Sequence, residues 1–143
     1  MLSENAADWP PHDRLLSPAT PFVDERGSIQ PVLDRGLGSV VVIASKAGAV
    51  RANHYHRTDW HYCYVLSGRI EYWHRPTGSA RAPESLVLRA GQMVFTPPML
   101  DHAMVFPEDT VFLTLGRGHR DPVSYENDIV KVELVGPDGR LRP

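Results

Sequence analysis

The sequence predicts an all-β fold, because short runs rich in valine, tyrosine, phenylalanine and threonine alternate with turn-forming residues. Thirteen prolines and eleven glycines separate these runs along the 143 residues. The runs recur about every ten residues, which is the spacing typical of barrels and sandwiches. Sustained helical periodicity is missing from the sequence, and only residues 124–128 are expected to form a short helical turn.

Nine strands are expected, and they divide the chain into one central domain with two flanking segments. The predicted strands span residues 40–44, 51–56, 62–66, 69–74, 85–88, 93–96, 102–106, 111–115 and 129–134. Ser67 and Gly68 separate two of these strands and predict a tight hairpin. We expect a proline-rich N-terminal arm at 1–21, a β-barrel at 22–135 and a frayed C-terminal tail at 136–143.

Composition excludes several classes of function. Fifteen basic and seventeen acidic residues give a net charge of −2, so a field that attracts nucleic acid is not expected. Cys63 is the single cysteine, which rules out an internal disulfide and favours a reducing compartment. No secretory signal or membrane-spanning apolar run is visible, so the sequence predicts a cytoplasmic protein with a small-molecule partner and no membrane contact.

Histidine spacing carries the main functional information. His54 and His56 are two residues apart, so on an extended strand both side chains leave the same face. His61 begins the next predicted strand, and His102 opens a later one after Pro97 and Pro98. Four imidazoles on one inner surface would bind a divalent transition metal such as iron, nickel, zinc, manganese or copper. We therefore predict a metal site formed by His54, His56, His61 and His102.

The spacing of these histidines with nearby glycines and a proline resembles the two motifs of the cupin superfamily. The first motif matches G48-AVRAN-H54-Y-H56-RTDW-H61-YCYVLS-G68, and the second matches G91-QMVFT-P97-PMLD-H102-AMV-F106. His61 stands where most cupins have glutamate, Met99 replaces the usual second glycine, and Phe106 replaces the usual asparagine. The resemblance implies a double-stranded β-helix, or jelly-roll barrel, with both motifs at its mouth.

A second resemblance favours a different chemistry. Asp24 to Gly27 and the string R51-AN-H54 are similar to motifs of cupins that epimerise or isomerise deoxy-sugar nucleotides, with Ala52 in place of a glycine. That resemblance implies a metal-free site in which His54, or His54 with His56, moves protons beside a ketone while a tyrosine assists. Arg51 and Arg26 would hold the diphosphate.

Several assignments remain open at this point. Cys63 shares strand parity with His61, and Cys63 and Met104 are expected to line the substrate pocket with the two arginines. The leading function is a metal-binding cupin that acts on a small, anionic, carbohydrate-like molecule. The alternatives are the metal-free epimerase or isomerase, a metal-dependent dioxygenase and a ligand-binding protein without activity. A homodimer is expected from the N-terminal arm and the resemblance.

Overall fold

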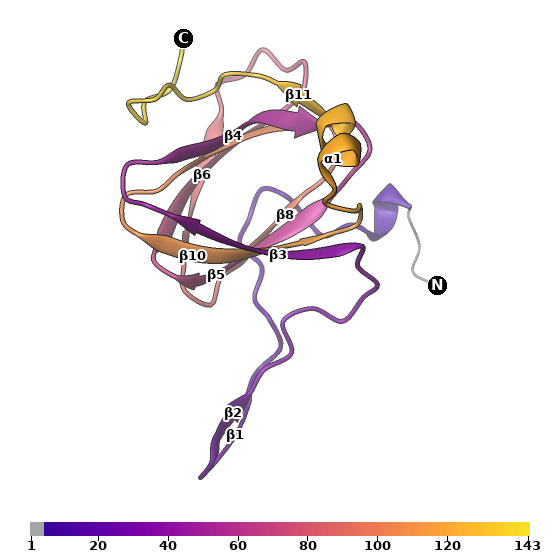
Figure 1. The fold of residues 1–143 in the computed structure, drawn as a ribbon, viewed down its shortest axis with the longest axis vertical. Coiled ribbons are helices and arrows are strands. Elements are labelled where there is room, and N and C mark those ends of the chain that lie inside the picture. The colour runs from indigo at the N-terminus through magenta and orange to yellow at the C-terminus, as the bar shows by residue number, and fades with distance from the viewer. Residues whose placement is uncertain (1–4) are drawn as a thin grey trace.

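The computed structural model describes residues 5–143, in which two large sheets face each other around a buried core and a third sheet has two strands (Figure 1). The strands are β1 (Phe22–Asp24), β2 (Gly27–Ile29), β3 (Ser39–Ser45), β4 (Val50–His56), β5 (His61–Ser67), β6 (Arg69–Pro76), β7 (Glu84–Arg89), β8 (Met93–Thr96), β9 (Leu100–Val105), β10 (Thr110–Gly116) and β11 (Ile129–Lys131). The helices are a short 3-10 helix η1 (Ala6–Asp8) and α1 (Pro122–Asp128).

The two large sheets are antiparallel throughout and exchange strands along the chain. One has the order β3-β10-β5-β8 and the other the order β11-β4-β9-β6-β7. Their facing sides bury a cluster that includes Val65, Ile70, Tyr72, Phe106 and Phe112, all fully inaccessible to solvent. Each such side chain contributes about 1.5–3 kcal/mol through removal of apolar surface from water. The predicted all-β, double-stranded β-helix class is confirmed.

Periodicity located the strands well. Eight of the nine predicted strands coincide with an observed strand to within two residues at each end. The exception is β11, which ends at Lys131 because the Asn53 side-chain oxygen then accepts the Leu134 and Val135 backbone N–H groups. The expected helical turn lies inside α1, which begins earlier because Asp121 caps it by accepting the Ser124 N–H.

The predicted hairpin at Ser67 and Gly68 is wrong. β5 and β6 lie in different sheets and do not pair, so Gly68 forms a corner at which the chain crosses between sheets. Its φ of 93° lies in the left-handed region, and an added Cβ would approach the Thr110 Oγ1 atom to 2.4 Å. The turn signal was correct, but local sequence does not reveal which strand pairs with which.

A bulge in β4 sets the direction of the side chains that later form the site. Ala52 and Asn53 both have positive φ, and the pairing with β9 shifts register between Ala52 and His54. Asn53 compensates for this conformation with hydrogen bonds to Leu134 and Val135, including one from its Nδ2 atom to the Val135 carbonyl. The bulge turns both Arg51 and His54 toward the space between the sheets.

The segment before β3 divides into a covered part and a projecting part. Trp9, Leu16 and residues 32, 33 and 37 pack on the outer apolar side chains of the four-stranded sheet. Between them, β1 and β2 form a separate two-stranded hairpin that projects away from the barrel (Figure 1). Sequence patterning did not predict this hairpin. The C-terminal segment 136–143 contains a turn, with a bridge between Val135 and Leu141.

The crossing at Gly68 predicts a sharp stability effect. Gly68→Ala should lower the free energy of unfolding by at least about 2 kcal/mol, because a Cβ would combine left-handed strain with a backbone clash. Gly78→Ala is the matched control, since Gly78 also has positive φ but open space around it, and should cost only about 1 kcal/mol. Urea unfolding of both variants measures the difference, and equal losses would contradict the assigned role of Gly68.

Candidate functional site

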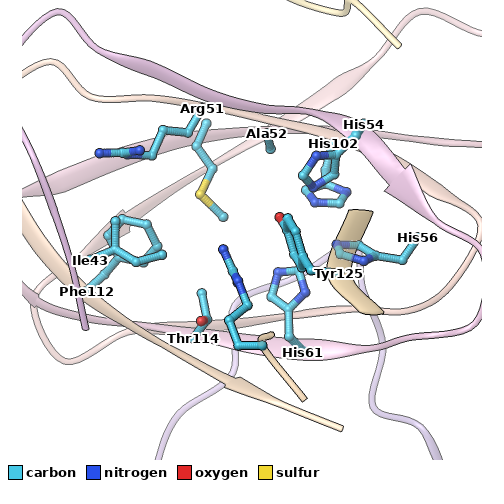
Figure 2. A pocket seen from close by; sticks show the side chains of 12 residues that line it. Ile43, Arg51, Ala52, His54, His56, His61, His102, Phe112, Thr114 and Tyr125 are labelled. Atoms are coloured by element: carbon cyan, nitrogen blue, oxygen red, sulfur yellow. The ribbon is translucent and has the colours of Figure 1, made fainter. Parts of the chain in front are cut away.

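A cavity of about 150 Å³ lies between the two sheets beside α1. Its lining comes from β3, β4, β5, β9 and β10, from α1 and from the segment that leads into α1 (Figure 2). The lining residues are Ile43, Arg51, Ala52, His54, His56, His61, His102, Met104, Phe112, Thr114, Arg120 and Tyr125. Histidines occupy one side of the cavity, while Arg51, Ile43 and Phe112 lie on the opposite side (Figure 2).

The four predicted histidines converge on this cavity. His54 and His56 both point inward because they are two residues apart on β4, and His102 on β9 is the register partner of His54. The ring centroid of His54 lies 4.9 Å from that of His56 and 4.8 Å from that of His102. The His61 ring, from β5 in the other sheet, lies 5.3 Å from the His56 ring. Residues almost fifty positions apart therefore share one inner surface.

The other predicted site residues divide into two groups. Arg51 and Met104 line the cavity, and Arg51 is fixed by hydrogen bonds from its guanidinium to the Ser45 hydroxyl and the Ala44 carbonyl. Cys63 does not line the cavity. Its side chain lies on the same face of β5 as that of His61, but it is fully buried in the core cluster.

Arg26 also lies outside the cavity. It occupies the turn of the projecting hairpin, where it is exposed and paired with Asp24. The Asp24–Gly27 motif, which is similar to one in sugar-nucleotide cupins, therefore forms a local turn. This turn lies far from the histidines of the same chain (Figure 1).

Burial keeps the imidazoles neutral. Removal from water, followed by the proximity of His56, lowers the pKa of His54 to about 3. Burial likewise lowers the pKa of His61 and of His102 well below the ordinary histidine value. Four neutral imidazoles present nitrogen lone pairs to a proton or to a cation at physiological pH.

His56 differs from the other three because a carboxylate orients its ring. Its Nδ1 atom lies 3.1 Å from Asp128 Oδ2, at the end of α1. Asp128 is itself fixed by the Thr58 N–H and hydroxyl and by the Asp59 N–H. Burial lowers the pKa of His56, and the hydrogen bond to Asp128 partly opposes this. With a proton on Nδ1, the buried Nε2 atom carries the lone pair, and it has no hydrogen-bond partner among residues 5–143.

Sequence reasoning missed three residues at this end of the site, all carried by the segment around α1. Tyr125 lies with its ring centroid 5.8 Å from the His56 ring, and burial raises the pKa of its phenol. The Arg120 guanidinium stacks 3.9 Å from the centre of the Tyr125 ring. Asp128 supports His56 as described above. The predicted turn at 124–128 correctly located the helix. It did not reveal which side chains of the helix point toward the histidines.

The donor set fits a divalent transition metal. Ligand atoms of His54, His56 and His102 all lie within 4.8 Å of one another. His102 Nδ1–H donates a hydrogen bond of 2.9 Å to the Leu100 carbonyl oxygen, the kind of contact that orients metal-bound imidazoles. His61 lies outside this three-residue group, so the geometry favours three of the four predicted ligands.

A small antiparallel barrel with a histidine-lined cavity between its sheets is the class that fold and site define. The sequence profile of the cupin domain matches residues 41–115, more than half of the chain. The protein therefore belongs to the cupin domain family. No curated protein sequence matches the chain.

Solved structures with this fold include several enzymes of sugar-nucleotide metabolism. A mutant of the 3,4-ketoisomerase QdtA from Thermoanaerobacterium thermosaccharolyticum, in complex with TDP-4-keto-6-deoxyglucose, has 16% identity and a TM-score of 0.67, with 82% of this chain and 86% of that chain covered. A 3,4-ketoisomerase from Helicobacter canadensis has 18% identity and a TM-score of 0.69, with 82% and 89% covered. The dTDP-4-dehydrorhamnose 3,5-epimerase from Sulfolobus tokodaii has 20% identity and a TM-score of 0.61, with 73% and 69% covered. At these identities the likeness establishes the shared fold.

Neither helix in residues 5–143 is both long enough and apolar enough to cross a membrane.

Burial of the neutral imidazoles predicts acid destabilisation of the metal-free protein. Because the folded-state pKa of His54 is depressed from 6.5 to about 3, its unfolded form takes up a proton first as the pH falls. The free energy of unfolding should be highest above about pH 6.5 and decrease steadily toward about pH 3. Urea unfolding over this range should show a shallower decrease for His54→Asn, and identical slopes would contradict the buried, neutral state of His54.

Proposed function

We propose that the protein is an isomerase or epimerase that moves a proton at a carbon beside a ketone, in a small anionic carbohydrate-like molecule of the keto-sugar-nucleotide class. One observation carries this proposal: in His56, which lines the cavity, the buried Nε2 atom has no hydrogen-bond partner among residues 5–143, while Asp128 holds the opposite ring nitrogen. This is the arrangement of a general base, whose tautomer and orientation a carboxylate fixes.

In the proposed reaction, His56 Nε2 removes the proton from the carbon next to the carbonyl. The electron pair of the broken C–H bond forms an enolate. In an epimerisation the proton then returns to the same carbon and the ketone re-forms. In an isomerisation the hydroxyl on that carbon first gives its proton to the former carbonyl oxygen, and the carbon-bound proton then returns to the former carbonyl carbon, so that the ketone moves to the neighbouring position. Tyr125 lies near both His54 and His56, with ring centroids 6.2 Å and 5.8 Å away. Its raised pKa keeps the phenol protonated, so it can donate a hydrogen bond to the oxygen that gains charge.

Charge and volume support an anionic substrate with one ring inside the cavity. Arg51 and Arg120 are the charged residues of the lining, and none of the lining residues carries a carboxylate. A cavity of about 150 Å³ accommodates one ring-sized group, since a cavity of that size binds benzene in another protein. Ile43, Met104 and Phe112 would contact the less polar part of that ring.

The similar solved structures agree with this class of substrate. Their names describe ketoisomerases and an epimerase of sugar nucleotides, and one contains TDP-4-keto-6-deoxyglucose. That compound is therefore the natural first substrate to test. The cytoplasmic location predicted from the sequence is compatible with such a substrate and stays a prediction.

Exchange of solvent deuterium into TDP-4-keto-6-deoxyglucose, followed by NMR, tests the proposed base. The wild-type protein should catalyse exchange beside the ketone, and His56→Asn should slow it by about 10²–10⁴-fold. Asp128→Asn should slow exchange by about 10–100-fold, because the His56 ring loses the carboxylate that orients it but still has the Nε2 atom that acts as the base. His74→Asn, a buried histidine outside the cavity lining, is the matched control and should retain the wild-type rate.

Loss of exchange in His74→Asn to the same extent would show that the effects are structural. A wild-type protein that catalyses no exchange in this compound or in other keto-sugar nucleotides would refute the proposed activity.

A metal-binding cupin is the second candidate, and the mutual proximity of the His54, His56 and His102 ligand atoms favours it. These residues would hold iron, nickel, zinc, manganese or copper, with His61 as a fourth ligand if its ring moves closer. A bound divalent ion would supply Lewis-acid polarisation of a carbonyl oxygen. His56 would then be a ligand rather than a base, so the two candidates are distinguishable.

Metal titration of chelator-treated protein separates these candidates. If the metal candidate is correct, isothermal calorimetry should show uptake of one ion per chain, and His102→Ala should weaken it by about 10–100-fold or more. His61→Ala should weaken it less, because His61 lies outside the three-residue group. The absence of uptake for all five metals would remove the second candidate, and exchange activity that survives chelation would support the first.

A further inference from the structure

We propose that Asp59 is a positioning residue, whose carboxylate holds the start of segment 118–128 so that Arg120 and Tyr125 stay beside the histidine cavity. The inference rests on the proposed function, in which Tyr125 donates a hydrogen bond to the oxygen that gains charge. Asp59 itself does not line the cavity. It therefore acts on the reaction through the segment that it holds.

Segment 118–128 joins β10 to β11, contains α1, and has little packing of its own. Two of its side chains, Arg120 and Tyr125, line the cavity, and the Tyr125 ring lies among the imidazoles (Figure 2). None of the residues 119–127 is buried. A segment with so few buried apolar groups moves at a low cost in free energy unless polar contacts hold it. Its position over the cavity therefore depends on how its two ends are attached.

The end of the segment is attached to the connection between β4 and β5, residues 57–60. The Asp128 side chain accepts hydrogen bonds there from the Thr58 N–H and hydroxyl and from the Asp59 N–H. The Asp128 backbone carbonyl also accepts the Arg57 N–H at 2.8 Å. The last residue of α1 is thus held by side-chain and backbone contacts to one short connection.

The start of the segment is attached to the same connection through Asp59. Its Oδ1 atom accepts the Gly118 N–H and the Trp60 N–H, both at 2.9 Å. Gly118 does not have positive φ, so its conformation does not require glycine. The close approach does, because an added Cβ would lie 2.8 Å from Asp59 Oδ2. Asp59 and Asp128 therefore fix the two ends of one loop on one connection.

Loss of the Asp59 contact would leave the segment attached mainly at its Asp128 end. The Gly118 N–H would lose its acceptor, and the unburied stretch that follows would be free to swing away from the barrel. Tyr125 would then leave the imidazoles, and Arg120 would move with it because its guanidinium stacks on the Tyr125 ring. The proposed reaction would lose a hydrogen-bond donor and one of the two arginines of the cavity lining.

Two effects of the Asp59 carboxylate must be separated, its contact with Gly118 and its charge near His56. Ligand atoms of His56, Asp59 and Asp128 lie within 4.8 Å of one another, so removal of the carboxylate also changes the electrostatic environment of the imidazole. Asp59→Asn separates the two effects, because the amide oxygen still accepts N–H groups but carries no charge. Asp59→Ala removes both the contact and the charge.

NOEs between the Tyr125 ring protons and the imidazole protons of His54 and His56 report the position of the segment without any substrate. The ring centroids lie 6.2 Å and 5.8 Å apart, so the wild-type protein should show these NOEs. Asp59→Ala should lose them, and Asp59→Asn should retain them. NOEs that persist in Asp59→Ala would overturn the proposal whether or not the protein is active.

Deuterium exchange into TDP-4-keto-6-deoxyglucose measures the consequence for the reaction. Asp59→Ala should slow exchange by about 10–100-fold, since misplacement of a group that contacts the substrate has an effect of this size. Asp59→Asn should remain within about threefold of the wild-type rate, because its amide oxygen keeps both hydrogen bonds. Equal losses in Asp59→Asn and Asp59→Ala would show that the charge matters rather than the contact, and would overturn the proposal.

Gly118→Ala disturbs the same contact from its other side and provides a second test if Asp59→Ala does not fold. It should lose the Tyr125 NOEs and slow exchange to a similar extent. Asp59→Ala combined with Gly118→Ala should be no slower than Asp59→Ala alone, because both changes remove one interaction. Additive losses would contradict a shared contact.

Asp109→Ala is the matched control. Asp109 also joins two connections through a backbone N–H, since it accepts the Ala47 N–H at 2.8 Å, but it lies outside the cavity lining. This variant should keep the Tyr125 NOEs and the wild-type exchange rate, and the same losses in it would make the effects of Asp59→Ala nonspecific and overturn the proposal. A wild-type protein without exchange would refute the proposed function, and the NOEs would still decide whether Asp59 positions the segment.

Discussion

The candidate site depends on the hydrogen bond between Asp128 and His56. This bond joins the short helix α1 to strand β4 and orients one of the four imidazoles, while the buried Nε2 atom of the same ring has no hydrogen-bond partner among residues 5–143. Without Asp128, burial alone would lower the basicity of each histidine and no ring would differ much from its neighbours. The contact with Asp128 therefore distinguishes His56 Nε2 from the other imidazole nitrogens, because the orientation and tautomer of its ring are fixed. Both a general base and a metal ligand need such a fixed ring.

The fold and the histidine cluster were largely predictable from sequence, since both depend on short-range spacing. Apolar alternation located the strands, and the two-residue step from His54 to His56 fixed their common face. Strand pairing was not predictable in the same way. Gly68 has the signal of a hairpin turn but forms a crossing between sheets, because tertiary packing against Thr110 determines the path of the chain.

Side chains that approach the site from distant segments were the hardest to predict. Tyr125 and Asp128 belong to a seven-residue helix with no buried residue, so apolar periodicity gives no signal for them. Cys63 had the correct parity but lies too deep in the barrel, since strand alternation specifies direction and not depth. Ala52 and Met99 replace glycines of the motifs that the sequence resembles, and both have positive φ. A residue with a side chain in this region carries local backbone strain, which glycine would avoid.

The protonation state of His56 tests the central claim most directly. Long-range ¹H–¹⁵N NMR spectra of histidine-labelled, metal-free protein distinguish the two neutral tautomers and the cation for each ring. We predict that His56 at neutral pH is neutral, with its proton on Nδ1 and an unprotonated Nε2, and that Asp128→Asn removes this preference. A His56 ring protonated at Nε2, or a tautomer that Asp128→Asn does not change, would contradict the assignment of a carboxylate-oriented nitrogen as the centre of the site.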